Sequence, residues 1–153
     1  SVYCFEPDDI CFSHLEKIQK IHHDIHIVHK GAWSNSGTLA FLSDGGAGRA
    51  HLIVDADELP SCAFQIEVVA VDDVIKEKIT YMKMDIEGAE LEALKGAKEQ
   101  IKKNKPTLAV CVYHRAEDLL EIPAYLKSLV PEYRFYLRHH SEWASETVLY
   151  AMI

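Results

Sequence analysis

Apolar runs that fit strands alternate along this chain with stripes that fit helices, and the clearest junction of the two lies at residues 81–101. Residues 81–86 are mostly apolar and lie between polar segments, which predicts a strand buried on both faces of a parallel sheet. One helix is predicted directly after it, with apolar residues on a single face at Ala89, Ala93, Leu94, Ala97 and Ile101. Pro106 prevents that helix from continuing.

The same alternation covers the rest of the chain. Further strands are predicted at residues 2–5, 25–28, 38–42, 50–54, 64–71, 107–113, 133–137 and 147–152. Further helices are predicted after Asp8 or Asp9 with Phe12, Leu15, Ile18 and Ile21 inward, from the caps Asp72 and Asp73 through Lys76, and from Ile122 and Pro123 onward. The short loop 139–146 favours an antiparallel pairing of the last two strands. The pattern predicts an α/β fold in which residues 1–153 form a single domain.

Polar side chains follow three of these strands where each one ends. Glu6 follows the first strand, Asp85 and Glu87 follow the strand at 81–86, and His114 follows the strand at 107–113. Ligands of open α/β sheets bind at the carboxyl ends of the strands, so we expect these side chains to lie on one rim. There, Glu6 can accept two hydrogen bonds from a ribose diol. An ordinary alternative stays open for each acid: Asp85 and Glu87 as helix caps, and Glu6 as a solvated turn acid.

Three other features of the sequence are weaker indications of a binding site. Trp33 follows the second strand and can stack on a flat ring such as adenine, or simply cover the edge of the core. The glycine-rich residues 43–48 predict a hairpin or flexible turn rather than a phosphate-binding loop, since neither a helix nor Gly-Lys-Ser/Thr follows. Histidines crowd residues 22–29, but no Cys, Asp or Glu completes a recognised zinc spacing. We therefore predict that the chain holds no metal.

Composition narrows the class of protein. The net charge of −8 argues against binding to nucleic acid or to anionic lipid, both of which need a basic face. No apolar run approaches the roughly 20 residues of a membrane span, and we expect no signal peptide. The four cysteines, at positions 4, 11, 62 and 111, form no Cys-x-x-Cys pair, which favours reduced thiols. These features predict a cytoplasmic protein.

Four segments of the chain together carry a family resemblance. They are Phe5-Glu6-Pro7, Val71-Asp72-Asp73, the Lys-x-Asp-x-Glu-Gly-x-Glu string at residues 83–90, and the terminal residues 146–151. In order and spacing, along nearly the whole chain, they resemble the FkbM family of S-adenosylmethionine-dependent methyltransferases. The resemblance implies a Rossmann-like class I methyltransferase fold, with a mostly parallel sheet and an antiparallel pair of strands at its C-terminal end.

The resemblance also implies roles for particular residues. Glu6 would hold the ribose of S-adenosylmethionine, Ala32 and Trp33 would lie near its adenine, and Asp85 would position the donor. Glu87 and His114 are then the candidate bases for the acceptor hydroxyl, because a sugar hydroxyl is a poor nucleophile. The family is associated with O-methylation, often of sugars, which implies a small-molecule or glycan acceptor.

One departure from the family pattern concerns the start of the chain. The family begins with a strand, a glycine-rich turn and a helix, and no residues before Ser1 match them. We therefore expect an N-terminally truncated methyltransferase domain that binds the donor weakly on its own. We also expect the two halves of the sheet to pair directly, to pair through another molecule, or to leave an exposed edge through which a homo-oligomer could form. The alternative is a non-catalytic, degenerate methyltransferase fold that serves as a binding or assembly module.

Overall fold

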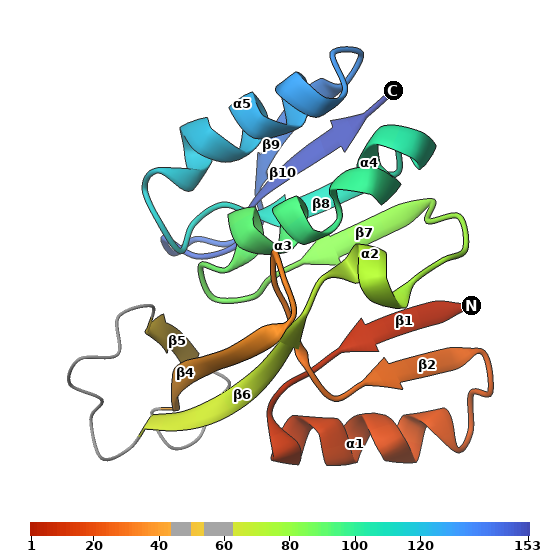
Figure 1. Cartoon of the computed structure of the whole chain (residues 1–153). Helices are drawn as coiled ribbons and strands as arrows, with labels where there is room; N and C mark the ends of the chain where they lie inside the picture. Colours follow the sequence, from red (N-terminus) through yellow and green to blue (C-terminus); the bar gives the residue numbers. More distant parts are fainter. Residues whose placement is uncertain (44–49, 54–62) are drawn as a thin grey trace.

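The computed structural model describes residues 1–43, 50–53 and 63–153 (Figure 1). The helices are α1 (Asp9–Gln19), α2 (Val71–Val74), α3 (Glu90–Gly96), α4 (Lys98–Asn104) and α5 (Asp118–Leu129). The strands are β1 (Val2–Phe5), β2 (Ile25–Val28), β3 (Gly31–Ala32), β4 (Gly37–Ser43), β5 (Ala50–Ile53), β6 (Ala63–Val69), β7 (Tyr81–Met84), β8 (Thr107–Cys111), β9 (Arg134–His139) and β10 (Thr147–Met152). The α/β class is confirmed. The glycine-rich loop predicted at 43–48 falls almost wholly outside the described residues.

The described strands form three sheets rather than one. Their orders are β1-β2, β7-β8-β10-β9 and β3-β6-β4-β5. The pairs β1–β2, β3–β6 and β7–β8 are parallel, whereas β4–β5, β4–β6, β8–β10 and β9–β10 are antiparallel. The predicted antiparallel pair at the C-terminal end is confirmed. The prediction of a mostly parallel sheet is wrong, because β4 pairs antiparallel on both of its edges and β10 inserts antiparallel beside β8.

The core lies between the sheet β7-β8-β10-β9 and the helices α3, α4 and α5, which follow one another across that sheet in Figure 1. The predicted helical stripe is buried, with Ala93, Leu94, Ala97 and Ile101 at 0% exposure. The helix itself is broken, since Ala97 has φ −108° and separates α3 from α4. Burial of this stripe holds α3 against the core, and α3 follows the end of β7, where the candidate residues lie.

Asp72 contributes to the break between α3 and α4. Its Oδ2 accepts the backbone N–H of Glu99 at 2.8 Å, and its Oδ1 accepts that of Gln100 at 3.0 Å. The carboxylate thus satisfies two of the four N–H groups that the first turn of a helix leaves free. The sequence had predicted Asp72 and Asp73 as caps of their own turn. That prediction is wrong, because the residue before α2 is Ala70, which makes no side-chain cap.

The N-terminal half is less buried than the apolar pattern predicted. Helix α1 has no buried residue, Ile18 is 44% exposed, and Ile21 is 75% exposed beyond the end of the helix. Cys4 in β1 is only partly buried. The physical reason is that α1 packs against the two-stranded sheet β1-β2, which offers a small surface.

Two other predicted elements differ in extent. Strand β7 ends at Met84 and is an edge strand among the described residues, so Tyr81 is 56% exposed instead of buried on both faces. Helix α5 begins at Asp118 and contains Pro123, whereas the sequence placed that proline at the start of the helix. Within α5, Leu126 is buried and Leu129 is partly buried against the core.

Strands β1 and β7 run in the same direction, and Figure 1 shows β1 between β2 and β7. In the described part of the chain the two strands form no ladder, and the Tyr3 hydroxyl joins β1 to the segment before β7 by donating to Glu77 Oε1 at 2.9 Å. Of the three predicted outcomes for the sheet, the described strands show the unpaired edges. Self-association through them stays a prediction.

Two predictions from composition can be compared with the described residues. Within them, no helix combines the length and the apolar content that crossing a bilayer requires. Cys4, Cys11 and Cys111 are free thiols as predicted, and Cys62 lies outside the described residues.

Candidate functional site

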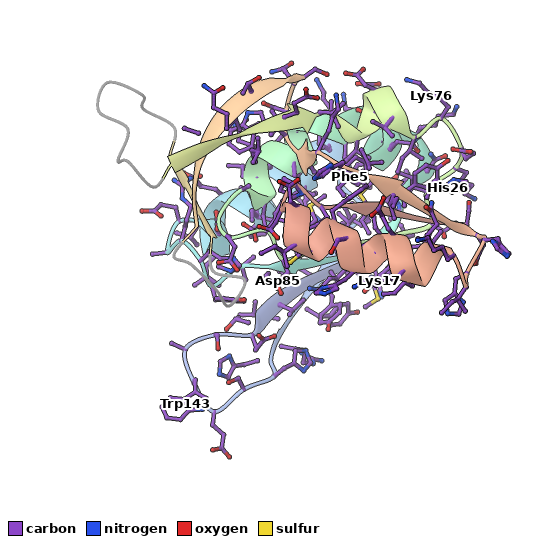
Figure 2. The ribbon with its side chains drawn as sticks, turned by 90° about the horizontal axis from the view of Figure 1, so that it is seen from below. Phe5, Lys17, His26, Lys76, Asp85 and Trp143 are labelled. Carbon is purple, nitrogen blue, oxygen red and sulfur yellow. The ribbon has the colours of Figure 1, made fainter. Side chains whose placement is uncertain are left out.

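The carboxyl ends of β1, β7 and β8 lie at the same side of the molecule (Figure 1). Three of the predicted residues meet there. His114 Nε2 lies 3.5 Å from Glu87 Oε2 and 3.7 Å from Asp85 Oδ1. Figure 2 labels Asp85 in this region, and it shows Trp143 at the tip of the projecting connection between β9 and β10. The prediction that polar side chains at the carboxyl ends of parallel strands lie together therefore holds for the ends of β7 and β8, which are far apart in sequence.

A tight turn presents Glu87 to His114. Glu87 has φ 57° and Gly88 has φ 91°, and the Ala89 N–H donates to the Ile86 carbonyl at 3.2 Å. Two successive positive φ angles with this hydrogen bond describe a type I′ turn. Glycine takes such a conformation freely, whereas for glutamate it costs free energy. Strain of this kind concentrates at functional sites, so the position of Glu87 is itself a functional indication.

Asp85 is held by hydrogen bonds from neighbouring side chains. Lys83 Nζ donates to its Oδ2 at 3.0 Å, and the Tyr113 hydroxyl donates to its Oδ1 at 3.0 Å. Burial alone would raise the pKa of Asp85, but the hydrogen bonds from Lys83, Cys111 and Tyr113 and the charge of Lys83 lower it. Asp85 is therefore a fixed, ionised carboxylate. It stands beside the histidine and is not free to cap the following helix.

The capping alternative for Asp85 and Glu87 is wrong. The residue that precedes α3 is Ala89, and no side chain makes a cap hydrogen bond there. Glu90 Oε1 accepts the Ile86 N–H at 2.9 Å, which ties the first residue of α3 to the turn before it. The oxygens of Asp85 and Glu87 face Lys83, Tyr113 and His114 instead.

Glu90 and His114 form a buried pair. Glu90 is 0% exposed, and its Oε1 lies 3.0 Å from His114 Nδ1. The side chain of His114 is 10% exposed. Burial alone would lower the pKa of His114, but the hydrogen bond to Glu90 and the charges of Glu90, Glu87 and Asp85 raise it. Among the described residues, Glu90 Oε2 and His114 Nε2 have no hydrogen-bond partner.

A further acid lies behind this pair at the start of α5. Asp118 is 2% exposed, and its Oδ2 has no partner within the described part of the chain. Burial raises the pKa of Asp118, and the charge of Glu90 adds to that effect, while Arg115 and His114 oppose it. The site therefore has a dry side, formed by Glu90 and Asp118, and an open side, where Glu87 and Asp85 are partly exposed.

These residues also define the one arrangement that resembles a metal site in the described part of the chain. Asp85, Glu90 and His114 each bring one ligand atom within 4.8 Å of the others. Their atoms already have partners inside the protein, since Asp85 accepts from Lys83 and Tyr113, and Glu90 Oε1 accepts from Ile86. A cation would have to displace those hydrogen bonds, so the absence of a metal stays our prediction.

Of the residues predicted to hold the donor, Asp85 belongs to this cluster, whereas Glu6, Ala32 and Trp33 come from other elements. Glu6 Oε1 accepts the Asp8 N–H at 2.9 Å, and burial raises the pKa of Glu6, partly offset by that hydrogen bond. Ala32 ends β3, and the Trp33 N–H donates to the Val69 carbonyl at 3.0 Å. The donor roles of Glu6, Ala32 and Trp33 stay predictions.

Sequence reasoning missed Glu90, Tyr113 and Asp118 as members of the site. Glu90 carried a signal, because it precedes Ala93 and Leu94 by three and four positions and so lies on the buried stripe of the helix. A charged residue on such a stripe is rare unless it is paired. Nothing comparable marks Asp118, which became part of the site only because α5 begins earlier than predicted.

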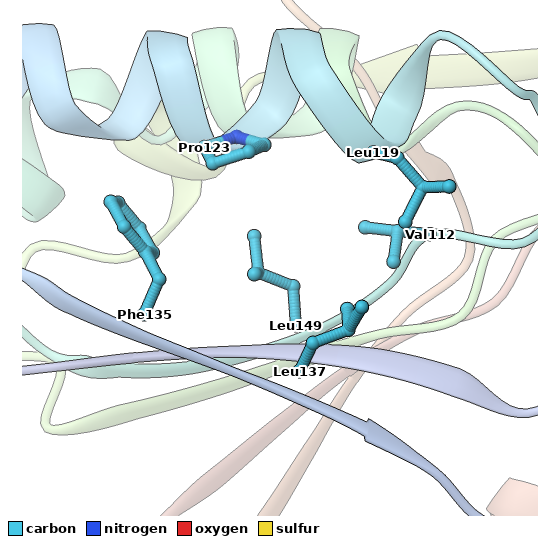
Figure 3. A pocket seen from close by; sticks show the side chains of 6 residues that line it. All are labelled: Val112, Leu119, Pro123, Phe135, Leu137 and Leu149. Carbon is cyan, nitrogen blue, oxygen red and sulfur yellow. The ribbon is translucent and has the colours of Figure 1, made fainter.

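A pocket of about 240 Å³ lies between α5 and the strands β9 and β10 (Figure 3). It is lined by Val112, Leu119, Pro123, Phe135, Leu137 and Leu149. None of these lining residues carries a titratable side chain. The pocket therefore supplies no group for catalysis, and the chemistry belongs to the rim around His114.

Comparisons with known proteins identify the family of this chain. A family model described as "Methyltransferase FkbM domain" matches residues 1–137. The chain belongs to the FkbM methyltransferase family. No curated protein matches this FkbM chain. Among solved structures, it resembles the crystal structure of methyltransferase FkbM from Methylobacillus flagellatus KT, with 34% sequence identity and a TM-score of 0.77. That match covers 98% of this chain and 36% of the other, so the chain spans about a third of the length of its solved relative.

Proposed function

We propose that this protein transfers a methyl group from S-adenosylmethionine to a hydroxyl oxygen of a small-molecule or glycan acceptor. The proposal rests on membership of the FkbM methyltransferase family. The observation that carries it to particular residues is the rim cluster, in which the unpartnered Nε2 of His114 faces Glu87 at 3.5 Å. An unpartnered, nearly buried imidazole nitrogen at a strand end is suited to accept a proton.

The residues on the rim fit the donor in one respect that can be checked. Glu6 uses Oε1 for its own turn, and in the described part of the chain no hydrogen bond engages its Oε2. A half-buried carboxylate oxygen at the carboxyl end of a strand fits a ribose hydroxyl. Trp33, held to β6 through its N–H, would lie against the adenine ring.

In the proposed reaction the acceptor oxygen bonds to the methyl carbon as the bond from that carbon to sulfur breaks, and the electron pair stays on sulfur. When bound, the sulfonium donor supplies the electrophilic methyl group. His114 Nε2 takes the proton that leaves the acceptor hydroxyl. Glu87, at 3.5 Å from the same nitrogen, stabilises the imidazolium that results, and Asp85 stays ionised to orient the reactants.

Donor binding and methyl transfer test this proposal. We would titrate S-adenosylmethionine into the 153-residue chain and into the polypeptide extended by whatever its gene encodes before Ser1, and then screen hydroxyl acceptors for methylation. Glu6→Ala removes a charge-assisted hydrogen bond of about 1.5–3 kcal/mol. We expect the Kd of the extended polypeptide to rise about 10- to 150-fold. Glu16→Ala, an exposed change on the outer part of α1, is the matched control and should leave the Kd unchanged.

The result also decides between the enzyme and the binding module. Neither donor binding nor methyl transfer by the extended polypeptide would overturn the proposal and favour a non-catalytic module. Micromolar binding by the 153-residue chain, abolished by Glu6→Ala, would instead contradict the expectation that this chain binds the donor weakly. A cytoplasmic location and a single methyltransferase-like domain over residues 1–153 complete the proposal.

A further inference from the structure

We propose that Glu90 is a positioning residue that fixes the tautomer of His114, so that Nε2 is presented to the acceptor as the proton-accepting atom. This inference rests on the proposed function for the role of His114, but the position of the ring proton can be measured without any reaction. Within the FkbM motif at residues 83–90, Glu90 is the only acid that is fully buried.

The hydrogen bonds of Glu90 determine where the ring proton lies. Its Oε1 accepts the Ile86 N–H at 2.9 Å, which fixes this oxygen as an acceptor. The same oxygen lies 3.0 Å from His114 Nδ1. An oxygen that serves as acceptor needs a donor opposite it, so in the neutral ring Nδ1 carries the proton and Nε2 carries the lone pair.

The remaining geometry aims that lone pair at the open side of the site. Nε2 has no hydrogen-bond partner among the described residues, although it is nearly buried. Its nearest polar neighbours are oxygens of Glu87 at 3.5 Å and Asp85 at 3.7 Å, and carboxylates cannot donate to it. An acceptor hydroxyl placed between these groups is the donor that the arrangement lacks. The same logic makes a buried carboxylate orient the histidine in serine hydrolases.

The side chain of Glu90 is also held in place on both sides. Glu90 begins α3, whose apolar face is buried in the core, and its Oε1 is tied to the turn that carries Glu87. A shift of Glu90 would therefore move the turn and the histidine together. The charged or titratable groups that face His114 are Glu90 from α3, Glu87 and Asp85 from the turn after β7, and Asp118 from α5, with Tyr113 and Arg115 as chain neighbours.

The first experiment measures the tautomer directly. Nitrogen-15 NMR of the purified protein, without donor or acceptor, distinguishes a protonated from an unprotonated ring nitrogen at each histidine. Above the pKa of His114 we expect a protonated Nδ1 and an unprotonated Nε2. The exposed histidine His22 gives the reference spectrum of an unconstrained ring. Glu90→Leu, checked for folding by circular dichroism, should shift His114 toward the Nε2–H tautomer.

The second experiment separates positioning from mere packing. Glu90→Gln keeps the shape and an accepting oxygen but removes the charge, so the pKa of His114 should fall, and the acidic limb of the kcat–pH profile should move to lower pH. We expect kcat to fall about tenfold or more with little change in the acceptor KM, since positioned proton transfer contributes roughly 10²–10⁴-fold. Glu92→Gln on the same helix is the control, because Glu92 pairs with Lys95 and does not touch His114.

Each outcome has a distinct meaning. A protonated Nε2 and an unprotonated Nδ1 in the wild-type protein, above the pKa of His114, would overturn the inference whatever the activity. An unchanged His114 pKa and pH profile in Glu90→Gln would overturn it as well. The expected tautomer and its dependence on Glu90, found in a protein that transfers no methyl group, would overturn the proposed function and not the geometry.

Discussion

Gly96 is the position where one added methyl group tests the packing of the fold most directly. It is the last residue of α3, and a Cβ built there overlaps the carbonyl oxygen of Trp33 and lies 2.9 Å from the carbonyl carbon of that residue. It also lies 3.2 Å from the Cα of Ala70. All of these atoms belong to the backbone, so no side-chain rotation can relieve the contact. We expect Gly96→Ala to destabilise the protein.

The magnitude follows from two opposing effects. Alanine is favoured over glycine in a helix by at most about 1 kcal/mol, and by less at a helix end. Overpacking costs typically 1–3 kcal/mol where side chains can adjust, and occasionally more. Here the backbone after β3 or the backbone before α2 must move, so we place the cost at about 3 kcal/mol or more. The net loss in the free energy of unfolding should therefore be about 2 kcal/mol or more.

Urea unfolding of the wild type and of Gly96→Ala, at equal protein concentration, measures this difference from the midpoint and the slope. Gly37→Ala is the matched control, because a Cβ at Gly37 meets nothing within 4 Å. It should change the free energy of unfolding by less than about 0.5 kcal/mol. A Gly96→Ala protein as stable as the wild type would refute the reasoning, since it would mean that the Trp33 carbonyl does not lie against α3.

Two further predictions concern stability. Asp72→Ala should lower the free energy of unfolding by about 1–2 kcal/mol in thermal or urea unfolding, because it removes the cap of α4, whereas exposed Asp73→Ala should not. Because the folded state raises the pKa of His114, the stabilisation from its protonation is fully present below about pH 6.5 and is lost as pH rises through the raised value. The difference in unfolding free energy between the wild type and His114→Gln should therefore shrink over that range, and a constant difference would contradict the raised pKa.

Local sequence patterns predicted the helices and strands well where one face of the element is fully buried. The stripe of Ala93, Leu94 and Ile101 predicted a buried helical face, and those residues are fully buried. The break after Gly96 could not be predicted from that stripe, since the pattern continues through Ala97 without interruption. It depends on contacts with Trp33 and Asp72, which are distant in sequence and become neighbours only in the folded chain.

The errors in the N-terminal half have a common physical cause. An apolar period predicts which face of a helix is turned inward, but it does not predict how large a surface covers that face. Ile18 is on the predicted face of α1 and is still 44% exposed, because the sheet beneath α1 has two strands. Similarly, the apolar pattern predicted strands at β4 and β6 but did not predict that they pair antiparallel with each other. Strand pairing depends on tertiary contacts, which the local pattern does not contain.

The geometry of the candidate site tests the alternative that Asp85 and Glu87 are only helix caps. From sequence, acids at the start of a helix are most simply caps, and a cap requires an extended residue whose side chain accepts the N–H groups of the first turn. Asp85 and Glu87 do neither: Glu87 has φ 57°, and no side chain caps α3. Their carboxylates instead surround His114, whose Nε2 lies between them, while Glu90 holds the other side of the ring. A chain that needed only a helix start would not place a glutamate in a left-handed conformation beside a buried histidine. The cost of that conformation is explained if Glu87 is required where it stands, opposite the nitrogen that we propose takes the proton.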